Sequence, residues 1–168
     1  MGGGWRILRD AGIELRDFPG ELRNELRALN REFLDQYRVS SVMRKDDVRF
    51  DHILQTQYVL GPSANRVAIN WSAAHTGVSH VWVGPGHIAH ARHAREIDQV
   101  DDPAAMWFDP TIWQITVSNR EVFVVLGEDD RTFAIVKVVR ILDAGRGDDR
   151  NEVTLSYEIR ARDKSSAQ

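Results

Sequence analysis

The sequence contains no cysteine. Disulfide bonds, thiol nucleophiles, thiolate zinc sites and iron–sulfur clusters are therefore excluded together. No apolar run approaches the length of a bilayer-spanning helix, and the first residues lack the apolar core of a secretory signal. We therefore expect a cytoplasmic protein without a membrane partner.

Lysine is also scarce, with only Lys45, Lys137 and Lys164, and the remaining basic residues are arginines scattered among acidic residues. The formal net charge is −3, so the chain has no overall positive field to attract nucleic acid. No basic stripe with interleaved aromatic residues is visible either. The composition therefore predicts no nucleic-acid partner.

What remains is the composition of an ordinary globular protein. Hydrophobic residues make up 42% of the 168 residues and charged residues 28%, a balance that suits one domain with a buried core. No internal repeat, low-complexity tract or linker divides the chain. We predict a single domain over residues 1–168, with flexible tails at 1–4 and 163–168.

The first part of the chain carries the clearest helical pattern. Two short extended pieces, 5–8 and 13–15, precede Asp17, which can cap a helix, and Pro19, which suits a first helical turn. Apolar residues then recur at helical spacing: Leu22, Leu26, Leu29, Phe33 and Tyr37. This stripe predicts an amphipathic helix over 19–38 that covers a sheet.

The middle of the chain is mixed. Residues 39–51 are charged and irregular, which favours a loop. Residues 55–60, 66–71 and 81–83 have strand patterns, and polar, glycine-bearing turns separate them. After Gly84-Pro85-Gly86 we predict a helix over 87–98, rich in histidine, and then a loop over 101–110.

The last third predicts four strands, at 112–117, 121–126, 131–142 and 151–162. The connections between them are short and polar, which favours antiparallel neighbours and hence a four-stranded meander. The strand 131–142 is apolar on both faces and should be central. The predicted fold is therefore α+β: an antiparallel sheet covered by one long amphipathic helix and a shorter histidine-rich helix.

The most unusual segment is 87–96, in which His87, His90, His93 and Glu96 recur every three residues. On an α-helix this spacing spirals, so one ion could take only a neighbouring pair such as His90 and His93. Other ligands, for example His80, would have to come from elsewhere. The spacing matches neither a zinc metalloprotease helix nor a di-metal helix, and Arg92 and Arg95 oppose a cation.

Tryptophan is abundant, with five residues in the chain. Strand alternation places His80 and Trp82 on one face, opposite Val81 and Val83. Tryptophan is enriched in ligand pockets and at interface hot spots, although it more often lies in a core. We take Trp71, Trp82 and His80 as a candidate binding surface.

Two classes of function survive these observations. The leading hypothesis is a non-enzymatic binding or assembly module that engages a protein partner or itself through a sheet face or an aromatic patch, without a cofactor. The alternative is a metal-dependent enzyme, most simply a hydrolase, in which His80, His87, His90, His93 and Glu96 hold a divalent metal ion. A third hypothesis is a small-ligand carrier that uses the region of Trp71 and Trp82.

Overall fold

The computed structural model describes residues 39–162. The extended pieces predicted at 5–8 and 13–15, the helix predicted over 19–38 and the two predicted tails lie outside the described residues. Within 39–162 the elements are strands and single turns of 3₁₀-helix. The strands are β1 Val39–Phe50, β2 Gln57–Leu60, β3 Val67–His75, β4 Val78–Trp82, β5 Ile88–His90, β6 Gln114–Ser118, β7 Val122–Leu126, β8 Thr132–Leu142 and β9 Glu152–Arg162.

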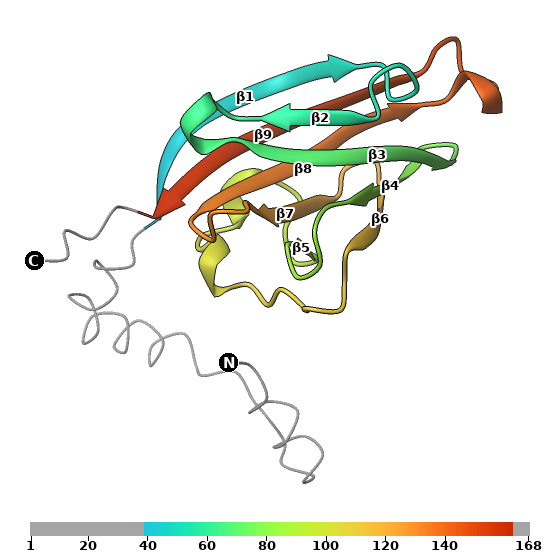
Figure 1. Ribbon diagram of the computed structural model, residues 1–168. Coiled ribbons are helices and arrows are strands. Elements are labelled where there is room, and N and C mark those ends of the chain that lie inside the picture. The colour runs from blue at the N-terminus through green and yellow to red at the C-terminus, as the bar shows by residue number, and fades with distance from the viewer. Residues whose placement is uncertain (1–38, 163–168) are drawn as a thin grey trace, which may run out of the picture. The chain divides into compact units, whose positions relative to one another are not determined.

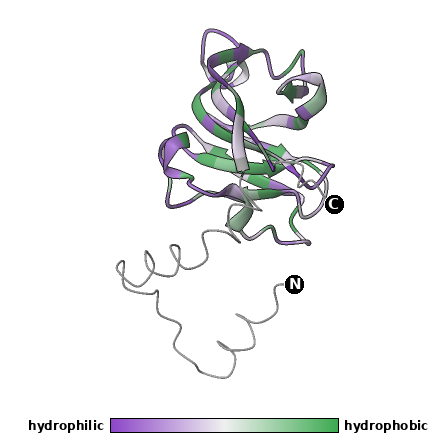
Figure 2. Ribbon diagram, turned by 90° about the vertical axis from the view of Figure 1, so that its left-hand side faces the viewer, coloured by the Kyte–Doolittle hydropathy of each residue, from purple (hydrophilic) through white to green (hydrophobic). Residues whose placement is uncertain are grey.

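These strands form two antiparallel sheets. Sheet A has the order β1-β9-β8-β7-β5 and sheet B the order β2-β3-β4-β6. The long strands β1, β9 and β8 lie side by side in Figure 1, and β8 is the middle strand of sheet A. The prediction that strand 131–142 is central is confirmed. Hydrophilic residues gather in the loops that join the strands (Figure 2).

The main core lies between the two sheets. Trp71 of β3 and Val81 of β4 are fully buried on the inner face of sheet B, and Phe123 of β7 and Leu155 of β9 are fully buried on the inner face of sheet A. The rings of Trp71 and Phe123 meet edge to face, with their centroids 6.2 Å apart. This contact joins the two layers, as in a β-sandwich.

A second core lies on the outer face of sheet A, beneath residues 91–108, which we call the strap. Val122, Val124, Phe133 and Ile135 of β7 and β8 pack against the strap's buried residues, Ala91, Ala94, Ile97 and Val100. Phe108 near the end of the strap lies 6.4 Å from Phe133, measured between ring centroids. Strands β7 and β8 are therefore buried on both faces.

The predicted α+β fold is wrong for this part of the chain. Strands make up 52% of it, and no helix of seven or more residues occurs among residues 39–162. The histidine-rich helix predicted over 87–98 is instead strand β5 followed by the start of the strap. Ala94 N donates to Ala91 O (2.8 Å) and closes a single turn, and the one 3₁₀ turn near this segment is Ile97–Gln99, after which Val100 N donates to Ile97 O (3.0 Å).

The predicted four-stranded meander is also wrong at its first connection. Strand β6 pairs with β4 in sheet B, whereas β7, β8 and β9 form a three-stranded meander in sheet A. The chain changes sheets at Asn119 and Arg120, where Arg120 adopts a left-handed conformation with φ of 70°. The Asn119 carboxamide accepts a hydrogen bond from Ile141 N (2.8 Å) and fixes this corner.

The loop predicted over 39–51 is wrong as well, since these residues form β1, the edge strand of sheet A. Strand β1 pairs with β9 from Val39↔Arg162 to Phe50↔Val153. The pairing is irregular between Lys45 and Val48, where Asp47 has a positive φ of 52°. This β-bulge accommodates the charged run that resembles a loop in the sequence.

Candidate functional site

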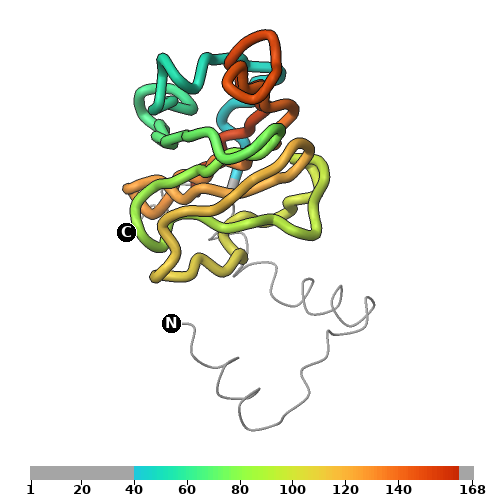
Figure 3. The backbone as a smooth tube through the Cα atoms, turned by 90° about the vertical axis from the view of Figure 1, so that its right-hand side faces the viewer, coloured from blue at the N-terminus to red at the C-terminus, as the bar shows by residue number. Residues whose placement is uncertain are grey.

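The outer face of sheet B carries two rows of polar side chains, which we call the polar face. One row crosses all four strands and the other crosses three, because residues paired across antiparallel strands share a face. The rows are Gln57↔Asn70↔Trp82↔Gln114 and Ser72↔His80↔Thr116. All seven side chains are half-buried or exposed. Figure 3 looks at the molecule from the side on which β4 and β6 lie.

The polar face contains no Asp, Glu, Lys or Arg and is internally hydrogen-bonded. His80 Nδ1 lies 3.0 Å from Thr116 Oγ1, and Asn70 Nδ2 donates to the Trp82 carbonyl at 3.3 Å. Gln57 Nε2 lies 3.4 Å from Asn70 Oδ1. None of the seven side chains carries a fixed charge, whereas the outer face of sheet A contains Lys137, Glu158 and Arg160.

The three predicted surface residues separate in the structure. His80 and Trp82 lie together on the polar face, on the side of β4 opposite the buried Val81. Trp71 is fully buried on the inner face of sheet B. Trp71 and Trp82 therefore lie on opposite faces of one sheet and do not line a common cavity.

At the edge of the polar face a pocket of about 400 Å³ opens where β6 of sheet B meets β5 of sheet A. We call it the arginine pocket, and its lining residues are His90, Ala91, Arg92, Arg95, Thr116, Glu121 and Val122. His90 ends β5 opposite Phe123 of β7. Thr116 belongs to both the pocket and the polar face.

The electrostatics of this pocket centre on His90. Burial lowers the pKa of His90, the positive charge of Arg92 lowers it further, and the carboxylate of Glu121 acts in the opposite direction. Glu121 is held in place because its Oε2 accepts a hydrogen bond from Ser118 N at 2.8 Å. His90 is therefore a neutral imidazole at neutral pH, between a cation and an anion.

A second hollow, of about 490 Å³, lies beside strands β2 and β3. Gln57 and Val59 line one wall, and Gly84, His87 and the turn 127–129 line the other. His87 is tied to the scaffold, because its Nδ1 lies 3.0 Å from the Leu126 carbonyl oxygen. The carboxylate of Asp129 is already hydrogen-bonded within this turn, because it accepts from Thr132 N and Oγ1 (2.8 and 2.7 Å).

The candidate metal ligands are distributed over separate places in the fold. His80 lies on the polar face, His87 beside the second hollow and His90 in the arginine pocket. His93 is exposed on the strap, and Glu96 forms an ion pair with Lys137 of β8 at 2.5 Å. Among residues 39–162, no three His, Asp or Glu side chains lie close enough to share a metal ion.

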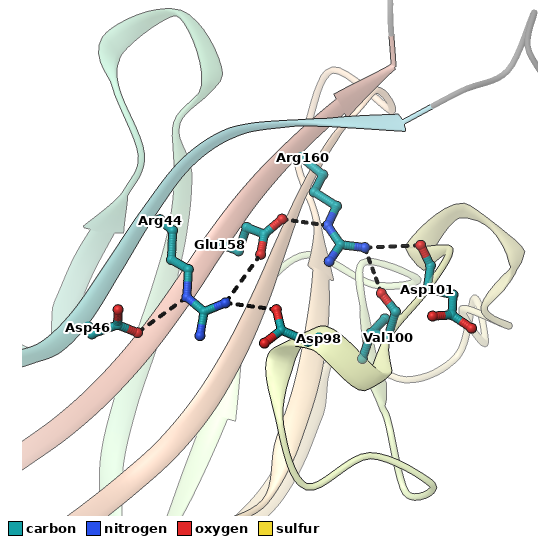
Figure 4. Close-up of polar contacts among 7 residues, drawn as sticks. All are labelled: Arg44, Asp46, Asp98, Val100, Asp101, Glu158 and Arg160. Atoms are coloured by element: carbon teal, nitrogen blue, oxygen red, sulfur yellow. Dashed lines mark hydrogen bonds and ion pairs between the residues drawn. The ribbon is translucent and has the colours of Figure 1, made fainter.

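A network of charged groups beneath the strap involves β1 and β9 (Figure 4). Glu158 is almost fully buried, and Arg160 Nε donates to it at 2.7 Å. Arg160 also donates to the carbonyl oxygens of Val100 and Asp101, at 2.6 and 3.0 Å. Beside them, Arg44 pairs with Asp98 at 2.8 Å. Because these groups bond one another and the strap backbone, we assign this network to holding the strap in place.

Sequence reasoning found His80, Trp82 and His90 but missed most of their surroundings. Asn70 and Ser72 alternate with buried residues along β3, and Gln114 and Thr116 do so along β6. These polar positions were visible in the sequence. These residues share one face because β6 pairs with β4, and the sequence does not reveal this pairing.

Comparison with protein-family models, with curated proteins and with solved structures finds no match to this chain. In the part of the chain that the structure describes, no helix is long and apolar enough to cross a membrane.

Proposed function

We propose that this chain is a binding module that associates with a second copy of itself through the polar face. The observation that carries the proposal is the composition of the polar face, a half-exposed tryptophan surrounded by amide, hydroxyl and imidazole groups without a fixed charge. Protein interfaces are enriched in aromatic residues and depleted of charged residues at their centres. The polar face has both properties.

A second copy fits the polar face because the face is complementary to itself. In a two-fold interface each residue type meets the same surface, so like charges would face each other if any were present. The carboxamides of Asn70 and Gln114 both donate and accept hydrogen bonds, as do the hydroxyls of Ser72 and Thr116. Two copies can therefore pair these groups without leaving an unpaired charge.

Trp82 is the residue expected to contribute most to the free energy of association. It lies in the middle of the row Gln57↔Asn70↔Trp82↔Gln114, and truncating a tryptophan at such a position typically costs about 2 kcal/mol or more. This corresponds to an increase of more than about tenfold in the dimer dissociation constant.

The metal-dependent alternative has less support. Its five candidate ligands lie on the polar face, beside the second hollow, in the arginine pocket and on the strap, and Glu96 is already paired with Lys137.

Sedimentation velocity of the full chain over a range of concentrations tests the proposal. We expect a monomer–dimer equilibrium that Trp82→Ala shifts at least about tenfold towards monomer. Trp107→Ala is the matched control, because Trp107 is 60% exposed on the strap, away from sheet B, and should leave the equilibrium unchanged. A wild-type monomer at every concentration, or equal effects of both variants, would refute self-association through this face.

A second test of self-association introduces a charge into the polar face without shortening any side chain. Gln114→Glu places one negative charge on each polar face, so the two charges would meet in a dimer. We expect dissociation in this variant, with a melting temperature equal to that of wild type when both are measured at concentrations where wild type is monomeric. Gln55→Glu is its control, since Gln55 is exposed in the loop before β2. An unchanged dimer in Gln114→Glu would place the contact elsewhere.

A further inference from the structure

The arginine pocket lies beside the polar face and has a different chemistry. Its fixed charges are Arg92 and Arg95, both positive, and Glu121, which is negative. His90 adds no charge at neutral pH. The pocket therefore has a net positive charge in a chain whose overall formal charge is −3.

The local backbone explains why two arginines reach the same pocket. Ala91 continues from β5, with its N–H donating to Val122 O at 3.0 Å, and the next turn closes from Ala94 N to Ala91 O. Ala91 and Ala94 are both buried against sheet A, at 1% and 0% exposure. Buried residues recur every three positions here, at Ala91, Ala94 and Ile97, so Arg92 and Arg95 each follow a buried alanine and both are exposed.

The guanidinium groups of these two arginines lack carboxylate partners. Among the described residues, Arg92 forms no ion pair, and the Arg95 guanidinium has one contact, from Nη1 to the neighbouring Ala94 carbonyl at 3.4 Å. Elsewhere on the strap, Glu96 and Asp98 pair with Lys137 and Arg44. The donors of Arg92 and Arg95 are therefore available to a ligand.

We propose that the arginine pocket binds the phosphate or carboxylate group of a small organic anion. The planar guanidinium fork matches both groups, since it can donate two parallel hydrogen bonds to a pair of anionic oxygens. The neutral His90 imidazole has one further N–H donor, and the Thr116 hydroxyl provides another. At about 400 Å³ the pocket has room for an organic group attached to the anion.

Glu121 sets the selectivity of this site. Its carboxylate lies in the same pocket but is held by Ser118 N at the corner between the sheets. It repels an anion that approaches its side of the pocket and can accept a hydrogen bond from a hydroxyl of the ligand. An anion with a neighbouring hydroxyl group therefore suits the pocket, and we expect citrate, which has one, to bind more tightly than inorganic phosphate.

Titration of the full chain followed by two-dimensional amide NMR tests this site, with inorganic phosphate and citrate as separate probes in buffer containing sodium chloride. We expect saturable shifts of the amide signals of residues 90–95, 116 and 121. Shifts with phosphate alone assign a phosphoryl ligand, shifts with citrate alone assign a carboxylate ligand, and shifts with both support the shared anion chemistry.

The double variant Arg92→Gln/Arg95→Gln should weaken binding at least about tenfold, because each arginine donates charge-assisted hydrogen bonds. The matched control is Arg131→Gln/Arg140→Gln, which removes two positive charges at exposed positions, in the turn before β8 and in β8, and should leave binding unchanged. The absence of saturable shifts with either probe would overturn the proposal. An equal loss in both double variants would do so too, since it would show attraction by overall charge.

Because this test uses neither Trp82 nor Gln114, it is independent of self-association through the polar face. The chain can fail one test and pass the other.

Discussion

Replacing Arg160 with methionine should destabilise the domain and release the strap. The side chains of Arg160 and Glu158 are 13% and 8% exposed, so their 2.7 Å ion pair is almost inaccessible to solvent. Removing one partner of a buried pair costs about 3–5 kcal/mol, because the other charge remains buried. Among residues 39–162, the ion pair left to Glu158 would be the one with Arg44, at 4.0 Å. The loss is a large part of the 5–15 kcal/mol that stabilises an ordinary domain.

The double variant Glu158→Leu/Arg160→Met should cost less than the sum of the two single variants. It leaves no uncompensated charge, so we expect a coupling free energy of about 1–3 kcal/mol in a double-mutant cycle. The free energies of unfolding come from urea denaturation. Additive single variants, with coupling below about 0.5 kcal/mol, would refute the assignment of this pair as a buried unit.

Hydrogen exchange separates the loss of the tether from general destabilisation. Arg160 holds the strap through the carbonyls of Val100 and Asp101. In Arg160→Met the amide of Val100, which bonds Ile97 O, should exchange faster than amides in the centre of β8. Arg150→Met is the control, because it removes an exposed arginine and should change neither the urea midpoint nor exchange in the strap.

Three further variants test the core and the titrating groups. Val138→Asp buries an unpaired charge at a fully buried position of β8 and should cost several kcal/mol; a soluble variant that melts cooperatively would contradict this. His52 is 1% exposed and neither ring nitrogen has a hydrogen-bond partner among the described residues, so His52→Leu should be neutral or stabilising by up to about 1–3 kcal/mol; a large loss in urea denaturation would reveal a hidden partner. Because burial lowers the pKa of His90, which faces Arg92, Arg95 and Glu121, the unfolded chain takes up this proton first, and stability should fall as pH decreases through about 6.5. Melting temperatures measured between about pH 7.5 and 5.5 should fall less in His90→Gln than in wild type, and equal slopes would remove His90 as the cause.

Strands were predicted correctly where apolar and polar residues alternate regularly or where an apolar run is uninterrupted. In β9, Val153, Leu155, Tyr157 and Ile159 face the core, as the alternation predicts. Strand β8 is central because it is apolar on both faces, and the strap explains the burial of its outer face. The side of β4 that carries His80 and Trp82 was also predicted correctly. These features depend on local patterns that burial enforces.

The error over 87–98 has a specific physical cause. Ile88, Ala91, Ala94 and Ile97 recur every three residues, and all are between 0% and 1% exposed. An α-helix has 3.6 residues per turn, so a strict period of three drifts around its surface and cannot keep all four residues on one face. In the structure Ile88 lies in β5, Ala91 and Ala94 flank a single turn, and Ile97 begins a 3₁₀ turn. The period itself was visible in the sequence and opposed a continuous α-helix.

The remaining errors arise from contacts distant in the sequence. The short connection between β6 and β7 resembles a hairpin, but the left-handed Arg120 and the Asn119 carboxamide direct it from one sheet to the other. The arginine pocket follows from this corner, because β6 then lies beside β5 instead of β7. In the sequence, the positive charges of Arg92 and Arg95 opposed a metal site. That both arginines line one pocket follows only from the fold.

The pairing of β1 with β9 has a consequence for the order in which this domain folds. Val39 pairs with Arg162 and Phe50 with Val153, so this edge of sheet A forms only when segments far apart in the sequence meet. Closing so long a loop carries a large entropic cost, whereas β7, β8 and β9 are joined by short turns. We therefore predict that the three-stranded meander forms first and that β1 docks on it afterwards. Such non-local pairing slows folding. Until β1 pairs with β9, the backbone of β9 is an unpaired sheet edge through which two partly folded chains can associate.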